Sequence, residues 1–332
     1  MSTLAVTHPT LLDLAKRTDP DLKIATIVEI LNQTNEMLDD MVWLEGNLLT
    51  GHRTTIRTGL PTPTWRKLYG GVQPTKSTTA QITDNTGMLE AYAEVDKALA
   101  DLNGNTAAFR LSEDSAHIEG MSEEIQDTIL YGNEGSEPEA FTGLSPRFNL
   151  TTAPNGQNII DAQGTGTDNG SIWLIVWGPR TVHGIVPKGS TAGLKFEDKG
   201  QVTIENVDGA GGRMEAYRSH YRWDAGLTVR DWRYVVRICN IDKSLLTVAM
   251  STGADLSDLM FQAMELIPNL GSGRAAFYMS RSMRTMWRRQ LSYKVKDSVL
   301  SFEDVGGRRT EMFQGIPVRR VDKMAADEAR VL

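Results

Sequence analysis

The chain has 332 residues, of which 40% are hydrophobic and 23% are charged, and its formal net charge is −7 at pH 7. This length allows one large domain or two, with a core that needs neither disulfides nor metals, and the composition is not that of a disordered chain. The negative charge argues against a protein whose main task is to bind nucleic acid, because phosphate binding needs a basic surface. It still allows a protein that encloses nucleic acid without holding it.

The single cysteine, Cys239, excludes a disulfide framework or a cysteine-based zinc site within the chain. Its apolar neighbours predict a small core residue, and such a chain suits a reducing cytoplasm. The N-terminal sequence lacks a basic region followed by a long apolar stretch, so we expect no signal peptide. The strongest apolar run, 172–177, has the length of a strand and is too short to span a bilayer.

The first predicted element is a short amphipathic helix near residues 20–33, because Asp19 can cap a helix that Pro20 begins. From residue 46 to residue 83, proline, glycine and threonine are frequent enough to exclude a long helix. Two alternating stretches in this segment, 54–57 and 78–82, therefore predict a long two-stranded arm.

Two helices are expected next. Apolar residues at helical spacing over 88–102 predict the first, which would end at Asn103 and Gly104. The same spacing over 118–129 predicts the second, with Ser112 as its N-cap and Gly132 at its end.

The second half of the chain is predicted to be rich in strands. After loop-like residues 133–170, we expect a strand buried on both faces at 172–177, another at 182–186 and a hairpin of 201–207 with 214–223. A strand over 232–238 should have one mostly polar face. Helices over 256–264 and 283–291 and a strand over 310–322 follow. Helices and strands are segregated along the chain, so the expected class is α+β.

Motifs of catalysis, metal binding and phosphate binding are missing from the sequence. The five histidines are scattered, and no two have the spacing of metal ligands. The glycines of 164–170 resemble a dinucleotide fingerprint, but the last spacing is wrong and a strand follows where that motif needs a helix. We therefore expect no catalytic, metal or cofactor site, although some enzyme families have no short motif.

Charge segregation is the feature that stands out. No acidic residue occurs from Gly46 to Thr83, and the five basic residues there are Arg53, Arg57, Arg66, Lys67 and Lys76. The segment from Asp84 to Ala140 contains fourteen acidic residues, and its only basic residues are Lys97 and Arg110. A basic arm with few large apolar residues gains stability on an oppositely charged surface, in its own chain or in a neighbouring copy. A contact of the second kind is heterologous and builds rings or lattices. Alternatively, both runs are solvated faces.

A further basic stretch, 267–296, holds seven arginines and lysines and no acidic residue. It could contact enclosed DNA or acidic partners. We favour a helix face that pairs with carboxylates of its own fold, because the net charge is negative and packaged DNA needs a wall that does not bind it.

Several stretches carry a resemblance to a known family: Leu44–His52, Thr62–Lys67, Asp231–Arg237 and the closing Phe313–Val318. Together with the order of the predicted parts, they resemble the major capsid proteins of tailed bacteriophages, which have the Hong Kong 97 fold. The likeness covers nearly the whole chain. It is strongest to the coat proteins of short-tailed phages of the Bordetella podophage and Salmonella epsilon type.

The resemblance implies a division of the chain into named parts. Residues 1–45 would form the N-arm, 46–84 the extended E-loop and 85–150 the P-domain with its spine helix. Residues 151–270 would form the β-rich A-domain, and 271–332 the return through the A- and P-domains with the C-terminal strand.

The resemblance also implies a function without catalysis. The subunit would assemble into hexamers and pentamers of an icosahedral shell around double-stranded DNA, in the cytoplasm of a host bacterium, with portal, scaffolding and cement proteins as partners. We expect no covalent cross-link between subunits. The alternatives are an encapsulin-type shell and a cytoplasmic α+β enzyme without a short motif. Our hypothesis for the inter-subunit contact joins the five basic arm residues to four acids of the second helix, Asp114, Glu119, Glu123 and Glu124.

Overall fold

The computed structural model describes residues 36–102, 106–206, 210–293, 300–305 and 308–332. The helix predicted near 20–33 lies outside these residues. The chain divides into two compact units. Among the described residues, the first unit contains 88–125 and 193–224, and the second contains the remainder.

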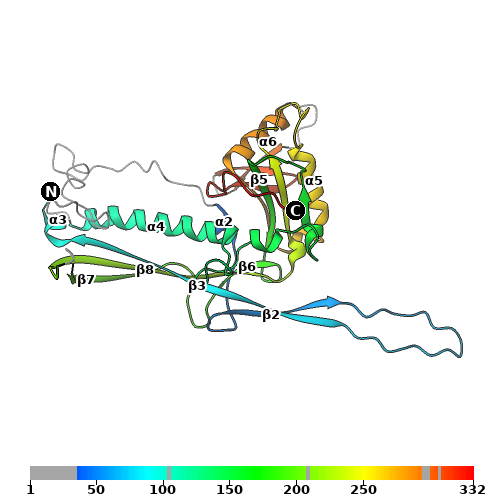
Figure 1. Ribbon diagram of the computed structural model, residues 1–332, viewed down its shortest axis with the longest axis horizontal. Helices are drawn as coiled ribbons and strands as arrows, with labels where there is room; N and C mark the ends of the chain where they lie inside the picture. Colours follow the sequence, from blue (N-terminus) through cyan, green and yellow to red (C-terminus); the bar gives the residue numbers. More distant parts are fainter. Residues whose placement is uncertain (1–35, 103–105, 207–209, 294–299, 306–307) are drawn as a thin grey trace. The chain divides into compact units, whose positions relative to one another are not determined.

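The first unit pairs one long helix with long strands. It contains α3 (Lys97–Asp101), most of α4 (Thr106–Tyr131), β7 (Lys195–Glu205), the end of β3 (Thr78–Asp96) and the first two thirds of β8 (Arg213–Val229). Strands β7 and β8 form an antiparallel hairpin, as predicted, and α4 runs along it in Figure 1. Ala93 of β3, Met121 of α4 and Tyr221 of β8 meet in a small core.

The helix predicted over 88–102 is wrong for most of its length, because residues 88–96 continue β3 and only 97–101 are helical. Burial in this segment follows a period of two. Ala93 and Val95 are buried, whereas Met88 and Tyr92 are 58% and 51% exposed. Met88, Tyr92 and Val95 have helical spacing, but Leu89, Ala91, Ala93 and Val95 alternate, and tertiary packing selects this strand pattern. Asp96 then caps α3 by accepting from the backbone N–H of Ala98.

The second predicted helix is confirmed, but it begins at Thr106 and not at Ser112. Ser112 lies inside α4, so its predicted role as N-cap is wrong. Two alanines precede it in the sequence Thr-Ala-Ala-Phe-Arg-Leu, which favours a helix. The core positions Met121 and Ile125 are buried as predicted, and Gly132 follows the last helical residue.

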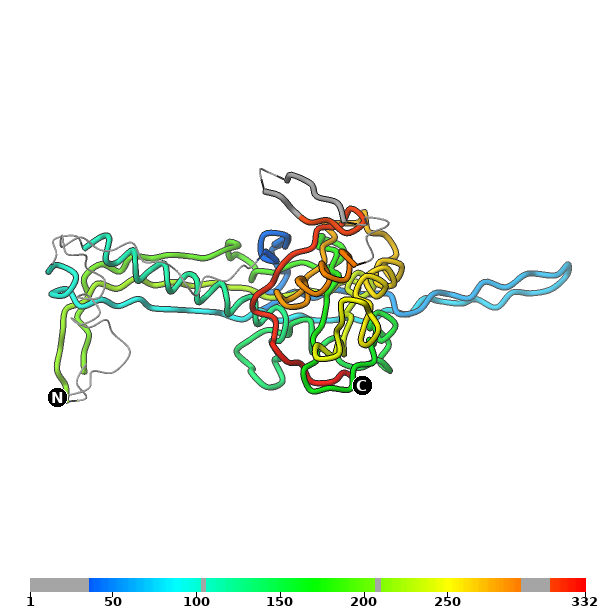
Figure 2. The backbone as a smooth tube through the Cα atoms, turned by 90° about the horizontal axis from the view of Figure 1, so that it is seen from above, coloured from blue at the N-terminus to red at the C-terminus, as the bar shows by residue number. Residues whose placement is uncertain are grey.

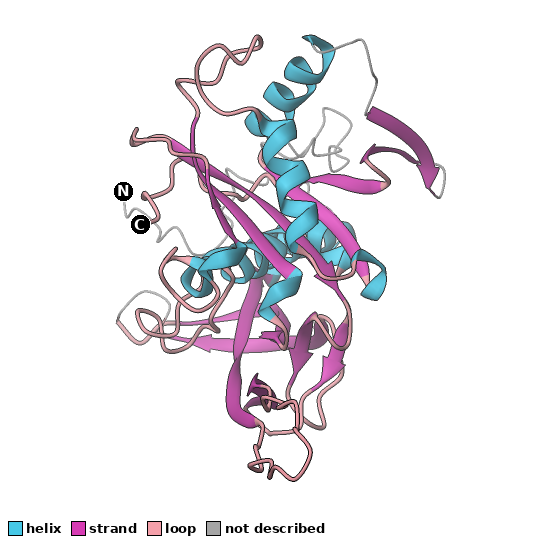
Figure 3. Cartoon of the chain, turned by 90° about the vertical axis from the view of Figure 1, so that its right-hand side faces the viewer, coloured by secondary structure: helices cyan, strands magenta, loops and turns pink. Residues whose placement is uncertain are grey.

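The second unit is built on a mixed sheet with helices packed against it (Figure 3). Its elements, besides the first part of β3 and the ends of α4 and β8, are α2 (Glu36–Asp40), β1 (Trp43–Glu45), β2 (Gly51–Gly59), β4 (Ile159–Asp161), β5 (Asn169–Trp177), β6 (Val182–Val186), β9 (Val235–Asp242), α5 (Leu256–Leu266), β10 (Arg274–Met279), α6 (Arg281–Tyr293), β11 (Leu300–Val305), β12 (Arg308–Phe313) and β13 (Ile316–Arg320).

Strand β5 lies at the centre of this sheet and is completely buried, as its apolar sequence predicts. It pairs antiparallel with β9 and β10, and β10 continues through β13 to β12 and β11. Helices α5 and α6 cover this region. Met260 and Trp287 pack with Phe277 and Phe313 of the sheet in an extensive hydrophobic core. The predictions for β5, β6, α5 and α6 are confirmed, and the α+β class is confirmed with them.

Two predictions for this unit need correction. The strand expected from residue 232 begins at Val235, after a 3-10 turn over Trp232–Tyr234. It has no exposed polar face, since all eight of its residues are buried, including Arg237. Cys239 in the same strand is a buried core residue, as predicted. The segment 310–322 forms two strands and not one, because Gln314 and Gly315 adopt positive φ angles in a tight turn.

Candidate functional site

The predicted two-stranded arm is present in the second unit. Residues 51–59 of β2 pair antiparallel with 78–85 of β3, and the connecting loop continues beyond the paired part (Figure 2). Arg53 and Arg57 are two of the alternate, exposed positions of β2. The side chain of Asn47 accepts from the backbone N–H of Arg53 at 2.7 Å and donates to its carbonyl at 2.8 Å. The arm therefore presents two guanidinium groups from a regular strand.

The loop of the arm combines exposed apolar side chains with exposed cations. Trp65 and Tyr69 are fully exposed, and Leu68 is 88% exposed. Arg66, Lys67 and Lys76 are exposed beside them. Large apolar side chains without cover are typical of an interaction surface. No acid lies between Gly46 and Thr83, so these cations have no carboxylate partner within the arm.

A buried polar group fixes the root of the arm. Asp84 of β3 accepts from Nη1 of Arg147 at 2.7 Å, and Arg147 also donates to three backbone carbonyls of the same unit. His52 of β2 lies opposite Asp84 and meets His183 of β6 edge to face, with ring centroids 5.9 Å apart. The root is thus a cluster of ionisable side chains between β2, β3 and β6.

Both histidines of this cluster are held in the neutral form. Burial, together with smaller contributions from the neighbouring His52 and Arg230, lowers the pKa of His183 to about 4. Burial also lowers the pKa of His52, with Arg230 adding to the shift and Asp84 opposing it. A proton on either ring is therefore disfavoured in the folded state.

The four acids of the predicted contact lie on α4, but they do not share one face. Asp114 points toward β8, where it accepts from Ser219 Oγ at 3.4 Å and contributes to raising the pKa of Tyr221 to about 12, mainly a result of burial. Glu123 follows Asp114 by nine residues, and an α-helix turns by about 100° per residue, so the two side chains lie on opposite sides of α4. Glu119 lies about one turn before Glu123. Glu124 is exposed between these directions. The arm belongs to the second unit and these acids belong to the first.

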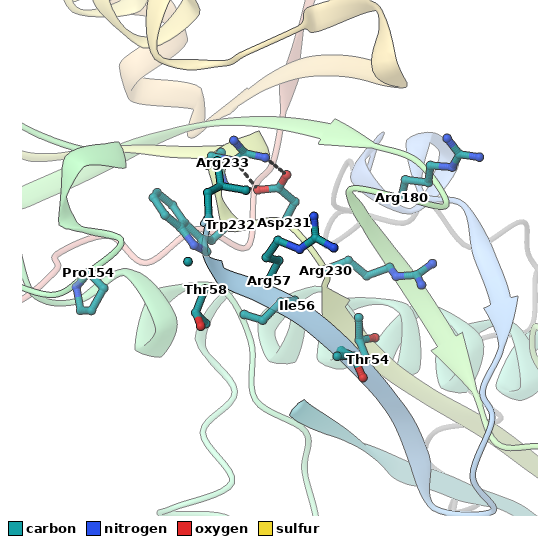
Figure 4. Close-up of a pocket in the computed structure, with 13 residues that line it drawn as sticks. Thr54, Ile56, Arg57, Thr58, Pro154, Arg180, Arg230, Asp231, Trp232 and Arg233 are labelled. Atoms are coloured by element: carbon teal, nitrogen blue, oxygen red, sulfur yellow. Dashed lines mark hydrogen bonds and ion pairs between the residues drawn. The ribbon is translucent and has the colours of Figure 1, made fainter. Parts of the chain in front are cut away.

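A groove that sequence reasoning missed lies in the second unit beside β2 (Figure 4). Its volume is about 940 Å³. One side is β2 from Thr54 to Gly59, and the other carries Arg180, Arg230 and the segment Asp231–Arg233. These residues come from three distant parts of the sequence, so no spacing pattern indicates the groove.

The groove has a positive charge. Arg233 donates to both carboxylate oxygens of Asp231, at 2.9 and 2.7 Å, and this pair is neutral. Arg230 donates to the carbonyl of Pro179 at 2.9 Å. Among the described residues, Arg57, Arg180 and Arg230 make no ion pair with a carboxylate, which leaves three positive charges along the groove.

Three arginines of the basic stretch around α6 pair with carboxylates of their own fold, as we favoured from the sequence, whereas Arg274 and Arg289 make no ion pair among the described residues. Arg284 Nε lies 3.0 Å from Oε2 of Glu311, and Arg288 pairs with the same carboxylate. Arg281 Nη2 lies 2.9 Å from Oδ2 of Asp322. Lys294 and Lys296 of this stretch lie outside the described residues.

Arg237 and Glu328 form a second feature that the sequence does not indicate. Glu328 accepts from Arg237 Nη2 at 2.7 Å, from Tyr131 at 2.8 Å and from Ser171. Arg237 also donates to the carbonyl of Phe148 and lies over the ring of Trp173. All these residues belong to the second unit, where they bind the C-terminal segment to the central strands.

Two kinds of site are not found among the residues that the structure describes. No group of three or more histidine, cysteine or acidic side chains there could hold a metal ion. Within the same residues, no helix has the length and apolar character needed to cross a membrane.

Comparisons with known proteins give one strong relationship. The family model described as "Major capsid protein GP7" matches residues 19–332. A chain in the structure of bacteriophage Epsilon15 is 39% identical, with 100% of this chain and 99% of that chain covered and a TM-score of 0.79. No curated protein matches the chain.

Weaker likenesses extend to other shells. The capsid chain of bacteriophage JBD30 is 10% identical, with coverages of 89% and 93% and a TM-score of 0.49. A holo-SrpI encapsulin chain from Synechococcus elongatus is 11% identical, with coverages of 70% and 97% and a TM-score of 0.44. At these scores, neither supports an argument about this chain.

Proposed function

Because the chain belongs to the major capsid protein GP7 family, we propose that it assembles with copies of itself into hexamers and pentamers of an icosahedral shell around double-stranded DNA. The observation that supports this most is the 39% identity to the Epsilon15 chain over the full length of both chains. Conservation of this extent, without large gaps in coverage, favours the virus shell over the encapsulin shell.

The arm supports a specific mode of assembly. Its cations have no carboxylate within residues 46–83, and its loop exposes Trp65, Leu68 and Tyr69 to solvent. Such a segment is stabilised when it lies on another surface. We place it on the acidic α4 of a neighbouring copy, near Glu119, Glu123 and Glu124, with Asp114 at the edge of the contact. Each exposed ion pair contributes only about 0.2–1 kcal/mol, so the contact is weak singly and strong when repeated around a ring.

Other aspects of the proposal follow from charge. The shell encloses DNA without reading its sequence, since the net charge is −7 and three arginines of α6 pair with carboxylates of their own fold. We further propose that subunits assemble in the host cytoplasm, bind portal, scaffolding and cement proteins, form no covalent cross-link and catalyse no reaction. Residues 1–45, 46–84, 85–150, 151–270 and 271–332 would serve as the N-arm, E-loop, P-domain, A-domain and C-terminal return.

The test is negative-stain electron microscopy of the purified chain, expressed with and without its scaffolding protein. We expect round shells or capsomer rings. An arm variant with Arg53, Arg57, Arg66 and Lys67 all changed to Glu should remain a soluble subunit, because its arm would repel the acidic helix. The matched control changes the three arginines to Lys and Lys67 to Arg, which keeps the charge and should assemble.

Either of two outcomes would contradict the proposal. If the unmodified chain is a uniform monomer in every preparation, the proposed shell function is wrong and the alternative of an α+β enzyme is favoured. Normal assembly of the charge-reversed arm would leave the shell function intact and remove the arm-to-helix mechanism.

A further inference from the structure

The groove beside β2 holds positive charge that its own chain does not neutralise. Arg57, Arg180 and Arg230 line it, and among the described residues none of them pairs with a carboxylate. Arg180 is exposed, so an approaching carboxylate can reach it. Like charges that face one groove repel one another unless an anion separates them.

Among the described residues, strand β2 also has one edge without a neighbouring strand, on which Asn47 bonds only the backbone groups of Arg53. Strand β2 ends the strand order of the sheet, and within the described residues it pairs only with β3. Its outer edge therefore carries N–H and C=O groups without a strand partner. Apolar surface from Ile56, Leu60 and Trp232 lies beside these groups. The groove is thus suited to a short polypeptide segment with carboxylates, which can use the cations, the strand edge and the apolar surface together.

An acidic turn of the same chain has the complementary properties. Residues 133–140 contain Glu134, Glu137 and Glu139 and no cation. Glu137 and Glu139 are exposed and, within the described part of the chain, make no ion pair. The turn is preorganised, because Asn133 accepts from the backbone N–H of Gly135 at 3.0 Å and of Glu137 at 2.9 Å. Little conformational entropy is lost when such a turn binds.

We propose that the groove of one subunit binds the acidic turn 133–140 of a second copy. Turn and groove belong to the same unit, yet no ion pair joins them among the described residues of one chain. Two copies can join them, and since the two surfaces differ, the contact is heterologous and propagates around a ring. This inference rests on the proposed self-assembly and adds a second contact to it, which shares Arg57 of β2 with the arm contact but uses neither the arm loop nor α4.

A charge exchange tests this contact. Arg180→Glu places a carboxylate in the groove, and Glu137→Lys places a cation on the turn. Each single variant should raise the subunit concentration needed for assembly by roughly tenfold or more, because apposed like charges cost several kcal/mol. The double variant R180E/E137K restores opposite charges and should recover most of the assembly. Lys188→Glu, the same charge change at an exposed position outside the groove and the turn, should assemble like the unmodified chain.

The outcomes separate this contact from the proposed function. If the unmodified chain assembles and R180E assembles equally well, the inference is wrong and the shell function stands. If R180E fails but E137K and Glu139→Lys assemble normally, another acidic surface occupies the groove and the inference is again wrong. Normal assembly of R180E with less DNA in its particles would identify a phosphate site instead. Recovery in the double variant excludes misfolding as the cause of the single defects.

Discussion

At the scale of single residues, the pair of Arg237 and Glu328 shows how the sheet accommodates a charge in its interior. The side chains are 3% and 7% exposed. Such a pair persists only when further hydrogen bonds satisfy the remaining donors and acceptors, and Ser171, Tyr131 and the carbonyl of Phe148 provide them. Next to this carboxylate, burial raises the pKa of Tyr131 well above its usual value. The phenol therefore stays protonated and can donate.

Glu328→Gln should destabilise the protein by about 3–5 kcal/mol, because it leaves the Arg237 guanidinium buried without a counter-charge. The measurement is urea unfolding at pH 7. The control is Asp327→Asn at the adjacent position, where the carboxylate is 64% exposed and pairs with Lys243. It should cost less than about 1 kcal/mol. Equal effects of the two variants would mean that the buried pair contributes no more than a surface pair.

The histidine cluster at the root of the arm predicts a loss of stability in acid. The folded state lowers the pKa of His183 from 6.5 to about 4, so it binds this proton less readily than the unfolded state. The stabilisation is complete above pH 6.5 and is lost as the pH falls toward 4. We measure the free energy of unfolding in urea at pH 7 and at pH 4.5. Between these two pH values, the free energy of unfolding of His183→Gln should fall by about 1–3 kcal/mol less than that of the unmodified protein. His117→Gln is the control, and an identical pH dependence of all three proteins would contradict the prediction.

At the scale of elements, the arm depends on its surroundings for its stability. A two-stranded hairpin is only marginally stable by itself in water. The root is fixed by Asp84 and Arg147, but the loop from residue 60 to residue 77 contributes no described residue to a buried core. Its order in a shell would therefore come from the neighbouring subunit.

Limited proteolysis should detect this dependence. Trypsin should cleave the free subunit first after Arg66 or Lys67, which are exposed in the loop. In an assembled shell the same bonds should be cut at least about tenfold more slowly, because the loop would lie on another chain. Mass spectrometry of the first fragments locates the cleavage. Equal rates in subunits and shells would show that the arm stays free after assembly.

At the scale of the whole molecule, assembly through complementary charges should weaken as salt is added. The Debye length falls from about 10 Å at 0.1 M to about 3 Å at 1 M. Light scattering of purified subunits should therefore show slower and less complete assembly as sodium chloride rises through this range. Faster assembly at high salt would mean that the apolar side chains of the arm loop dominate the contact and the ion pairs contribute little.

The sequence predicted the α+β class, the buried strand β5, the helices α5 and α6, the hairpin of β7 and β8 and the two-stranded arm. Each of these has an unambiguous local pattern of periodicity or turn residues. The resemblance to tailed-phage capsid proteins is confirmed by the family match and by the Epsilon15 chain. The predicted contact between arm cations and helix acids stays a prediction, because it would join two copies of the chain.

Other features were decided only by tertiary structure. Residues 88–96 have apolar spacings that fit a helix as well as a strand, and packing against distant residues selected the strand. Arg237 looks like an exposed strand residue until Glu328, 91 positions later, makes its burial favourable. Arg57, Arg180 and Arg230 form a groove only when β2 and two distant turns meet. Local sequence therefore determined where most elements form and where charge accumulates. Long-range packing determined which charges are neutralised within the chain and which, among the described residues, have no counter-charge.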